Sequence, residues 1–174
     1  MGDYIYGLDW GFSNDYTALV KVLVDGNNLY CQELLYEVGM TNQDIANRMM
    51  ELGIRKHYDE IWADSAEPKS IEEIYRYGFN IKGAPKGPGS VEYRHQKIRQ
   101  YKLQVTEDSL NLIKSLRNFR YIEDKNGKLT DKTTHNYSHL PDALGYAMIG
   151  REGVRKDMER VIVYNSMEEI DFDF

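Results

Sequence analysis

The sequence predicts an α/β protein built on a mixed β-sheet, in which three antiparallel strands are followed by parallel strands and helices flank the sheet. Apolar runs over residues 4–9, 18–24 and 29–36 open the chain, and turn-forming residues separate them. A helical pattern then leads to another short apolar run at 60–64. Because a strand–helix–strand connection places its two strands parallel, the later strands are expected to extend the same sheet.

The opening strands alternate with residues that favour turns. The first run ends at Asp9, and Gly11 with the small polar residues after it turns the chain. Asp25-Gly26-Asn27-Asn28 joins the second run to the third and is a tight hairpin signal. Asp9 is therefore predicted at the C-terminal end of a central strand, where α/β sheets collect functional side chains.

Helices are predicted where capping residues precede apolar residues at helical spacing. Thr41 and Asp44 form a capping box for a helix that places Ile45 and Met49 on one face. Pro68 suits the first turn of the next helix. Further helices are expected over 90–102, 109–117 and 141–151, and short strands over 79–81 and 103–105. An extra hairpin is predicted around Asn126-Gly127, the strongest hairpin turn dipeptide, and it is edged by Lys125 and Lys128.

The composition is that of a soluble globular domain, with 41% hydrophobic and 29% charged residues. We expect residues 1–153 to form one domain and 154–174 to form a partly flexible C-terminal extension. No apolar run is long enough to span a membrane. The single cysteine, Cys31, excludes an intrachain disulfide and a cysteine-rich zinc site, and it fits a reducing cytoplasm.

Three aspartates are predicted to meet around divalent metal ions. Asp64 ends the 60–64 run, and Asp142 lies at the start of the last helix. If the 60–64 strand lies parallel beside the first strand, Asp9 and Asp64 emerge at the same sheet edge and Asp142 approaches from the side. Carboxylates this close repel one another unless a cation lies between them, and oxygen ligands select Mg²⁺ or Mn²⁺. Each aspartate alone is more simply a strand end or a helix cap, but the three together favour a site.

Three auxiliary residues are weaker candidates. Asp15 is either an additional ligand or a turn residue, and His139 either assists proton transfer or caps a helix. Lys86 lies in a Gly/Pro loop and could hold a phosphate. That loop is not an ATP-binding P-loop, because no Gly-Lys-Ser/Thr follows at the needed spacing.

The charge is unevenly distributed along the chain. The net charge is −6, but residues 82–132 contain twelve Lys or Arg against six Asp or Glu. A basic stretch facing a carboxylate cluster suits a metal-dependent nuclease, although solvated helix faces are at least as common a cause of such runs.

With these motifs assembled, the chain resembles the C-terminal nuclease domain of the large terminase subunit of tailed bacteriophages, a branch of the ribonuclease H-like superfamily. The resemblance covers residues 4–152, with the motifs in the family's order and spacing. The matching segments are Gly7-Leu8-Asp9-Trp10-Gly11-Phe12-Ser13-Asn14-Asp15-Tyr16-Thr17, Ala63-Asp64-Ser65-Ala66-Glu67-Pro68, Lys86-Gly87-Pro88-Gly89-Ser90 and His139 to Ala147. One departure is Gly145, where the family often carries an arginine.

The resemblance implies a ribonuclease H-like fold and metal-dependent endonuclease cleavage of double-stranded concatemeric viral DNA during genome packaging. It implies that Asp9, Asp64 and Asp142 hold two Mg²⁺ or Mn²⁺ ions, which would stabilise the attacking and leaving oxygens of phosphodiester hydrolysis. Basic residues would contact DNA phosphates without reading sequence. The residues expected to do so are Lys86, Arg94, Lys97, Lys125 and Lys128.

The resemblance also implies partners and a location. Besides DNA, these are the N-terminal ATPase motor domain of the same protein, the portal and the small terminase subunit, with no membrane involved. The missing P-loop agrees with a motor that is absent from this chain. The expected location is the host cytoplasm, with transient residence at the procapsid portal.

Three other interpretations remain open at this point. Asp9, Gly11 and Thr17 also resemble the phosphate loop of an actin-like kinase lobe, but this chain has no room for the second lobe that such enzymes need. Another ribonuclease H-like nuclease, of the junction resolvase or transposase type, would prefer branched DNA. A non-catalytic clamp on DNA or on the portal would bind and not cleave.

Overall fold

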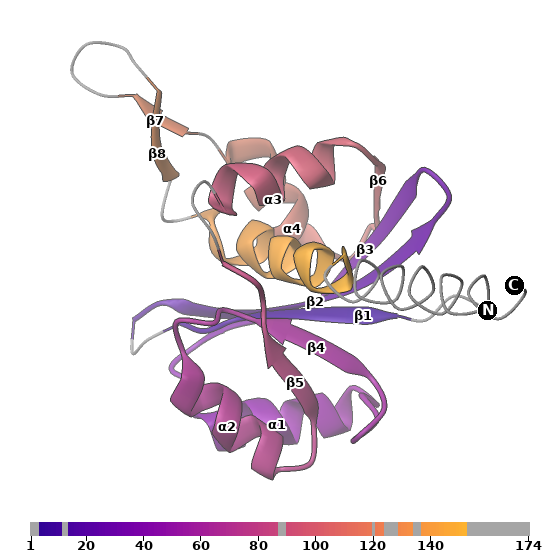
Figure 1. Ribbon diagram of the computed structural model, residues 1–174, viewed down its shortest axis with the longest axis vertical. Helices are drawn as coiled ribbons and strands as arrows, with labels where there is room; N and C mark the ends of the chain where they lie inside the picture. The colour runs from indigo at the N-terminus through magenta and orange to yellow at the C-terminus, as the bar shows by residue number, and fades with distance from the viewer. Residues whose placement is uncertain are drawn as a thin grey trace, which may run out of the picture.

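The computed structural model describes residues 4–11, 14–86, 90–119, 121–123, 129–133 and 137–152. A six-stranded sheet forms its centre, with the strand order β5-β4-β1-β2-β3-β6 (Figure 1). The strands are β1 (Ile5–Asp9), β2 (Tyr16–Asp25), β3 (Asn28–Val38), β4 (Glu60–Ala63), β5 (Asn80–Gly83) and β6 (Lys102–Val105). The predicted C-terminal extension and the lysines at 125 and 128 lie outside the described residues.

The sheet is mixed, as the sequence predicts. β1 pairs antiparallel with β2, and β2 pairs antiparallel with β3. β4 lies parallel to β1, β5 parallel to β4, and β6 parallel to β3. Strands β2 and β3 are longer than the apolar runs that predicted them, because their antiparallel pairing continues as far as Tyr16 and Val38.

Helices cover both faces of the sheet (Figure 1). On one face lie α1 (Asn42–Glu51) and α2 (Pro68–Arg76), and on the other lie α3 (Ser90–Arg99), α4 (Leu110–Asn118) and a helix over residues 139–152. The extra hairpin also forms, from β7 (Tyr121–Glu123) and β8 (Leu129–Thr133), and it projects away from the sheet. Within the described residues, no helix combines the length and the apolar character that crossing a membrane requires.

The local signals at helix ends act as expected. Thr41 caps α1 through the Asp44 backbone N–H, and the Asp44 carboxylate accepts a hydrogen bond from the Thr41 backbone in return. Ile45 and Met49 are fully buried under this helix. The last helix begins at residue 139, slightly earlier than the proline at 141 suggested. A shift of two residues is common at helix ends, which fray.

The side chains of β1 point alternately to the two faces of the sheet and pack into two separate apolar cores. Tyr6 and Leu8 pack with α1 and α2, whereas Ile5 packs on the face that carries helix 139–152. Gly7 lies on this second face. A Cβ atom added to Gly7 would lie 1.8 Å from the carbonyl oxygen of Ala143, so the helix backbone rests directly on the strand. The missing side chain at Gly7 thus sets how closely helix 139–152 approaches the central strand.

The N-terminus of α4 is capped by a residue from the sheet. Ser109 stands at the N-cap position but makes no side-chain cap hydrogen bond within its own helix. Instead, the Glu33 carboxylate of β3 accepts hydrogen bonds from the Leu112 backbone N–H at 2.8 Å and from the Asn111 amide at 2.6 Å. A negative charge at a helix N-terminus also interacts favourably with the helix dipole. Glu33 therefore joins α4 to the sheet.

We predict that Gly7→Ala lowers the free energy of unfolding by about 3 kcal/mol, because the clash is with backbone and no side-chain rotation relieves it. Gly26→Ala is the control, since nothing lies within 4 Å of a Cβ there and only its positive φ of 55° opposes the change. It should cost about 1 kcal/mol. Urea unfolding measures both, and equal losses would contradict the packing argument.

We predict that Glu33→Ala lowers the free energy of unfolding by about 1–2 kcal/mol, because two donors at the start of α4 lose their acceptor. The matched control is Glu37→Ala on the same strand, whose carboxylate is exposed and lies 3.8 Å from Arg48. That change should stay within about 0.5 kcal/mol in the same urea experiment. A Glu33 variant as stable as the Glu37 variant would show that the cap contributes nothing.

Candidate active site

Asp9 and Asp64 lie at the C-terminal ends of adjacent parallel strands. Leu8 of β1 is the register partner of Ala63 of β4, so each aspartate immediately follows a paired residue. Asp9 is buried, with 9% of its surface exposed. Burial raises the pKa of Asp9, and the nearby charge of Asp64 raises it further, while His139 opposes both effects. The structure therefore brings together the two carboxylates that the sequence placed at this edge.

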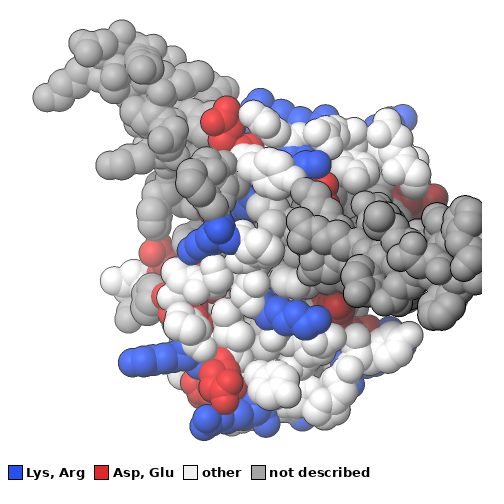
Figure 2. Space-filling view, in the orientation of Figure 1, with Lys and Arg blue, Asp and Glu red and all other residues white. Residues whose placement is uncertain are grey.

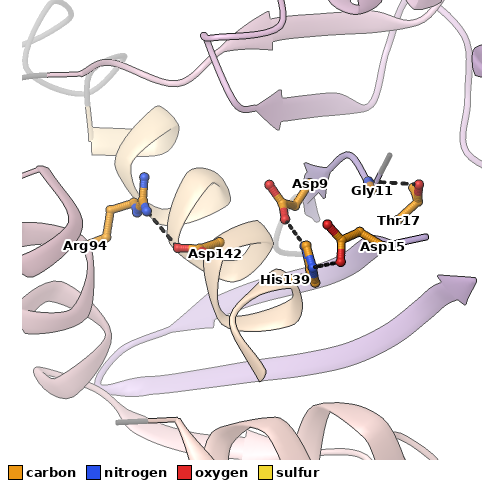
Figure 3. A network of polar contacts seen from close by, with 7 residues as sticks. All are labelled: Asp9, Gly11, Asp15, Thr17, Arg94, His139 and Asp142. Carbon is orange, nitrogen blue, oxygen red and sulfur yellow. Dashed lines mark hydrogen bonds and ion pairs between the residues drawn. The ribbon is translucent and has the colours of Figure 1, made fainter. Parts of the chain in front are cut away.

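Helix 139–152 brings Asp142 and His139 to the same edge. Both residues lie in its first turn, over the end of β1 (Figure 3). Burial raises the pKa of Asp142 to about 6, and Asp9 adds to the rise, while Arg94 counteracts it. The negative charge of Asp9 thus acts on Asp142. The close packing of the helix over Gly7 positions this third carboxylate.

Each of the three carboxylates contacts its own basic side chain. His139 Nδ1 lies 2.7 Å from Asp9 Oδ2, and the Arg94 guanidinium lies 2.7 Å from Asp142 Oδ1 (Figure 3). Lys86 Nζ lies 2.5 Å from Asp64 Oδ1. The hydrogen bond with Asp9 raises the pKa of His139, which favours its charged form. The negative charge of the cluster is thus balanced locally.

Asp15 lies beside His139 on the loop that follows β1. Its Oδ1 atom is 3.8 Å from His139 Nε2, and its side chain is 43% exposed. The fully buried Thr17 closes this loop, because its hydroxyl oxygen accepts a hydrogen bond from the Gly11 backbone N–H at 3.2 Å (Figure 3). His139 therefore lies between one buried carboxylate and one that reaches solvent.

Tyr146 belongs to the site although the sequence analysis did not single it out. Burial alone would raise the pKa of Asp64, but hydrogen bonds from Lys86, the Ala66 backbone N–H and Tyr146 lower it overall. The Tyr146 side chain is buried, and burial together with the surrounding carboxylates raises the pKa of its hydroxyl. Its position four residues after Asp142, one helical turn further along, is the sequence signal that would have identified it.

The structure corrects the prediction that Arg94 contacts DNA. The Arg94 side chain is 5% exposed and is held by Asp142, so its guanidinium is not available at the surface. Its charge lies 4.5 Å from the centre of the Tyr146 ring, and its aliphatic part passes over Gly145. Gly145 is the position where an arginine was expected from the resemblance. Arg94 of α3 therefore places a guanidinium beside the cluster, although position 145 itself carries no arginine.

Two other basic residues of the 82–132 stretch form ion pairs with carboxylates. Lys97 forms an ion pair with Glu152 at 2.9 Å, and Lys82 lies 3.4 Å from Glu60. On the face shown in Figure 2, Lys and Arg side chains occur in several separate groups, with Asp and Glu side chains among them. The expected DNA contact by Lys97 stays a prediction, and those by the lysines at 125 and 128 lie outside the described residues.

The donor chemistry of the cluster suits a hard divalent cation. Its carboxylates supply oxygen ligands, and two of them have pKa values raised partly by their mutual repulsion, which a cation would relieve. As the side chains are placed, no three His, Cys, Asp or Glu residues among those described form a ready-made metal cage. The carboxylates are turned toward Lys86, Arg94 and His139 instead. Asp9, Asp64 and Asp142 are the residues that could hold an ion after local rearrangement.

Comparisons with known proteins identify relatives of this chain. Residues 9–149 match the family described as Terminase RNAseH like domain. The chain is 34% identical over 145 residues to the PBSX phage terminase large subunit of Bacillus subtilis (strain 168), covering 82% of this chain and 33% of that protein. It is 31% identical over 150 residues to the terminase large subunit of Bacillus phage SPP1, covering 81% of this chain and 34% of that protein. The chain thus spans about one third of the length of these curated relatives.

Solved structures share the fold. The g2p large terminase nuclease domain of bacteriophage SPP1, crystallised with bound Mn, superposes with a TM-score of 0.74 and 29% identity over 83% of this chain and 84% of that one. The large terminase nuclease of thermophilic phage G20c gives a TM-score of 0.59 at 22% identity, over 84% of this chain and 81% of that one. At that identity the second likeness concerns the fold alone.

We predict that Asp142 titrates near pH 6 and that Arg94→Met raises its pKa, because the guanidinium stabilises the ionised carboxyl. Carbon-13 NMR of the side-chain carboxyl across a pH series measures the effect. The matched control is Lys97→Met on the same helix, which removes a charge that is paired with Glu152. An Asp142 pKa that is unchanged in the Arg94 variant, or equally shifted in the Lys97 variant, would contradict the assignment.

Proposed function

Since this chain belongs to the Terminase RNAseH like domain family, we propose that it is a metal-dependent endonuclease that cleaves double-stranded concatemeric viral DNA during genome packaging. Its fold and its relatives are those of the nuclease domain of phage terminase large subunits. The proposal for this chain's own reaction is phosphodiester hydrolysis with two divalent ions, Mg²⁺ or Mn²⁺. The related SPP1 nuclease domain carries Mn in its crystal structure, which supports the choice of metal.

The observation that carries this proposal is the meeting of Asp9, Asp64 and Asp142 at one sheet edge. Three carboxylates gathered at one place repel one another and offer several oxygen ligands, which is the donor set that a divalent cation prefers. When bound, two divalent ions would stabilise the attacking and leaving oxygens of the phosphodiester. The chain itself contributes the rigid placement of the ligands, from β1, β4 and helix 139–152.

His139 is proposed to move a proton at this site. Its Nδ1 atom is fixed by Asp9, which leaves Nε2 facing Asp15. Because Asp15 is 43% exposed, the ring connects the buried cluster to solvent. In the charged form that Asp9 favours, this histidine can donate its Nε2 proton at the site and regain a proton from solvent afterwards. Asp15 would orient the ring or act as a further ligand.

The wider setting is proposed from the relatives. Because the chain spans about one third of the terminase large subunits it resembles, the ATPase motor would lie elsewhere in the same protein. The portal and the small terminase subunit are the proposed assembly partners. The proposed place of action is the host cytoplasm, at the procapsid portal. Phosphate contacts would give DNA affinity without sequence choice, through lysines near the cluster such as Lys86.

Plasmid cleavage tests the proposal. We expect the wild-type chain to nick and linearise supercoiled plasmid in Mn²⁺ or Mg²⁺ and to be inactive in EDTA. Asp64→Ala should reduce the rate at least about a hundredfold, because the bound ions supply several kcal/mol of transition-state stabilisation. The matched control is Glu67→Ala, a nearby carboxylate at the N-cap of α2 that makes no side-chain cap hydrogen bond.

The outcomes separate the possible functions. Metal-dependent cleavage that Asp64→Ala removes and Glu67→Ala retains supports the nuclease. DNA binding without cleavage by the folded wild type would favour a clamp. A strong preference for branched DNA over linear duplex would favour a resolvase-like enzyme and contradict the packaging role.

A further inference from the structure

The three basic residues of the cluster differ sharply in their access to solvent. The side chain of Arg94 is 5% exposed and that of His139 is 10% exposed, whereas that of Lys86 is 43% exposed. Arg94 is also enclosed by Tyr146 and by the backbone at Gly145. Arg94 and His139 are therefore fixed parts of the site, and Lys86 is the basic residue with room to leave.

The contact of Lys86 with Asp64 is made from a short and well-anchored segment. The Ala84 backbone N–H donates to the Ala63 carbonyl at 2.8 Å, which holds the chain after β5 against the end of β4. Two residues later, Lys86 reaches Asp64 Oδ1. The same oxygen accepts a hydrogen bond from the Ala66 backbone N–H at 2.9 Å. Lys86 thus occupies part of the oxygen surface that Asp64 would offer to a metal ion.

The Lys86 ammonium and a divalent metal ion would compete for Asp64, and the metal ion has the advantage. A lysine ammonium is a strongly hydrated single charge on a flexible stem, so returning it to water from a site that is already 43% exposed costs little. An ion pair of this exposure contributes at most about 1 kcal/mol. A divalent ion gains more binding free energy from the Asp64 carboxylate than the ammonium does, because carboxylate oxygens are its preferred ligands. Arg94 has no comparable route to water, since its side chain is buried.

We propose that Lys86 is an exchange cation, which leaves Asp64 when a divalent ion binds and then contacts the phosphate of the DNA strand. This inference rests on the proposed nuclease function, and it gives Lys86 one role before metal binding and another after it. The ammonium remains tethered within a side chain's length of Asp64, and so within reach of a phosphate bound at the cluster. Removing Lys86 should therefore have opposite effects on metal affinity and on DNA cleavage.

Calorimetric titration with Mn²⁺ at pH 8, on the whole chain, tests the first effect. Lys86→Met should bind Mn²⁺ about three- to tenfold more tightly than wild type, which corresponds to the loss of a competing ion pair of this exposure. The matched control is Lys82→Met on the same stretch of chain. Lys82 is 48% exposed and pairs with Glu60, so its removal takes away the same charge without freeing Asp64. Its Mn²⁺ affinity should equal that of wild type.

Two further measurements complete the experiment. In an NMR titration of wild type with Mg²⁺, the Lys86 side-chain signals should shift at the same concentrations at which the ion binds, and the Lys82 signals should not. Plasmid cleavage at saturating metal should be at least about tenfold slower in Lys86→Met, because a charged contact to the phosphate is lost. Lys82→Met should cleave at the wild-type rate.

Each outcome decides a specific point. Equal or weaker Mn²⁺ binding by Lys86→Met, or equal tightening in Lys82→Met, would overturn the exchange. Tighter binding with unchanged cleavage would overturn the phosphate role. A wild type that neither binds Mn²⁺ nor cleaves would instead remove the proposed nuclease function, on which the inference rests.

Discussion

The structure depends on how it balances negative charge at one edge of its sheet. Asp9 is buried and Asp142 is half-buried, and burial raises the pKa of each. Repulsion adds to the effect, from Asp64 on Asp9 and from Asp9 on Asp142. Such a group is stable only beside positive charge, because the cost of burying unpaired carboxylates exceeds what nearby apolar packing can offset. His139, Lys86 and Arg94 supply that charge from three different elements. The repulsion that destabilises the cluster is also what gives it affinity for a divalent cation.

Strand pairing and helix packing position the residues of this cluster. Parallel pairing of β1 with β4 places Asp9 and Asp64 at neighbouring strand ends. The bare backbone at Gly7 lets helix 139–152 rest on β1, and the helix carries Asp142 and His139 in its first turn. Figure 1 shows this helix on the sheet face opposite α1 and α2. A separate apolar core lies on each face, so the sheet that carries Asp9 is packed on both sides.

Local sequence signals predicted most of the fold, because each acts over a few residues. The capping box at Thr41 and the hairpin after β2 are examples, and the register of parallel strands then places Asp9 beside Asp64. The role of Arg94 was not predictable in this way. Its burial depends on how α3 packs across Gly145, and no pattern within α3 distinguishes it from a surface arginine. The ion pair of Lys86 with Asp64 likewise depends on tertiary packing, which joins a loop after β5 to the end of β4.

The most direct test of this account is to locate a bound ion by anomalous diffraction from crystals of the chain grown with Mn²⁺. The account predicts Mn²⁺ coordinated by oxygens of Asp9, Asp64 and Asp142, with Lys86 turned away from Asp64 and Arg94 still on the Oδ1 atom of Asp142. Mn²⁺ bound away from these carboxylates, or absent at saturating concentration while Lys86 keeps its contact with Asp64, would contradict it.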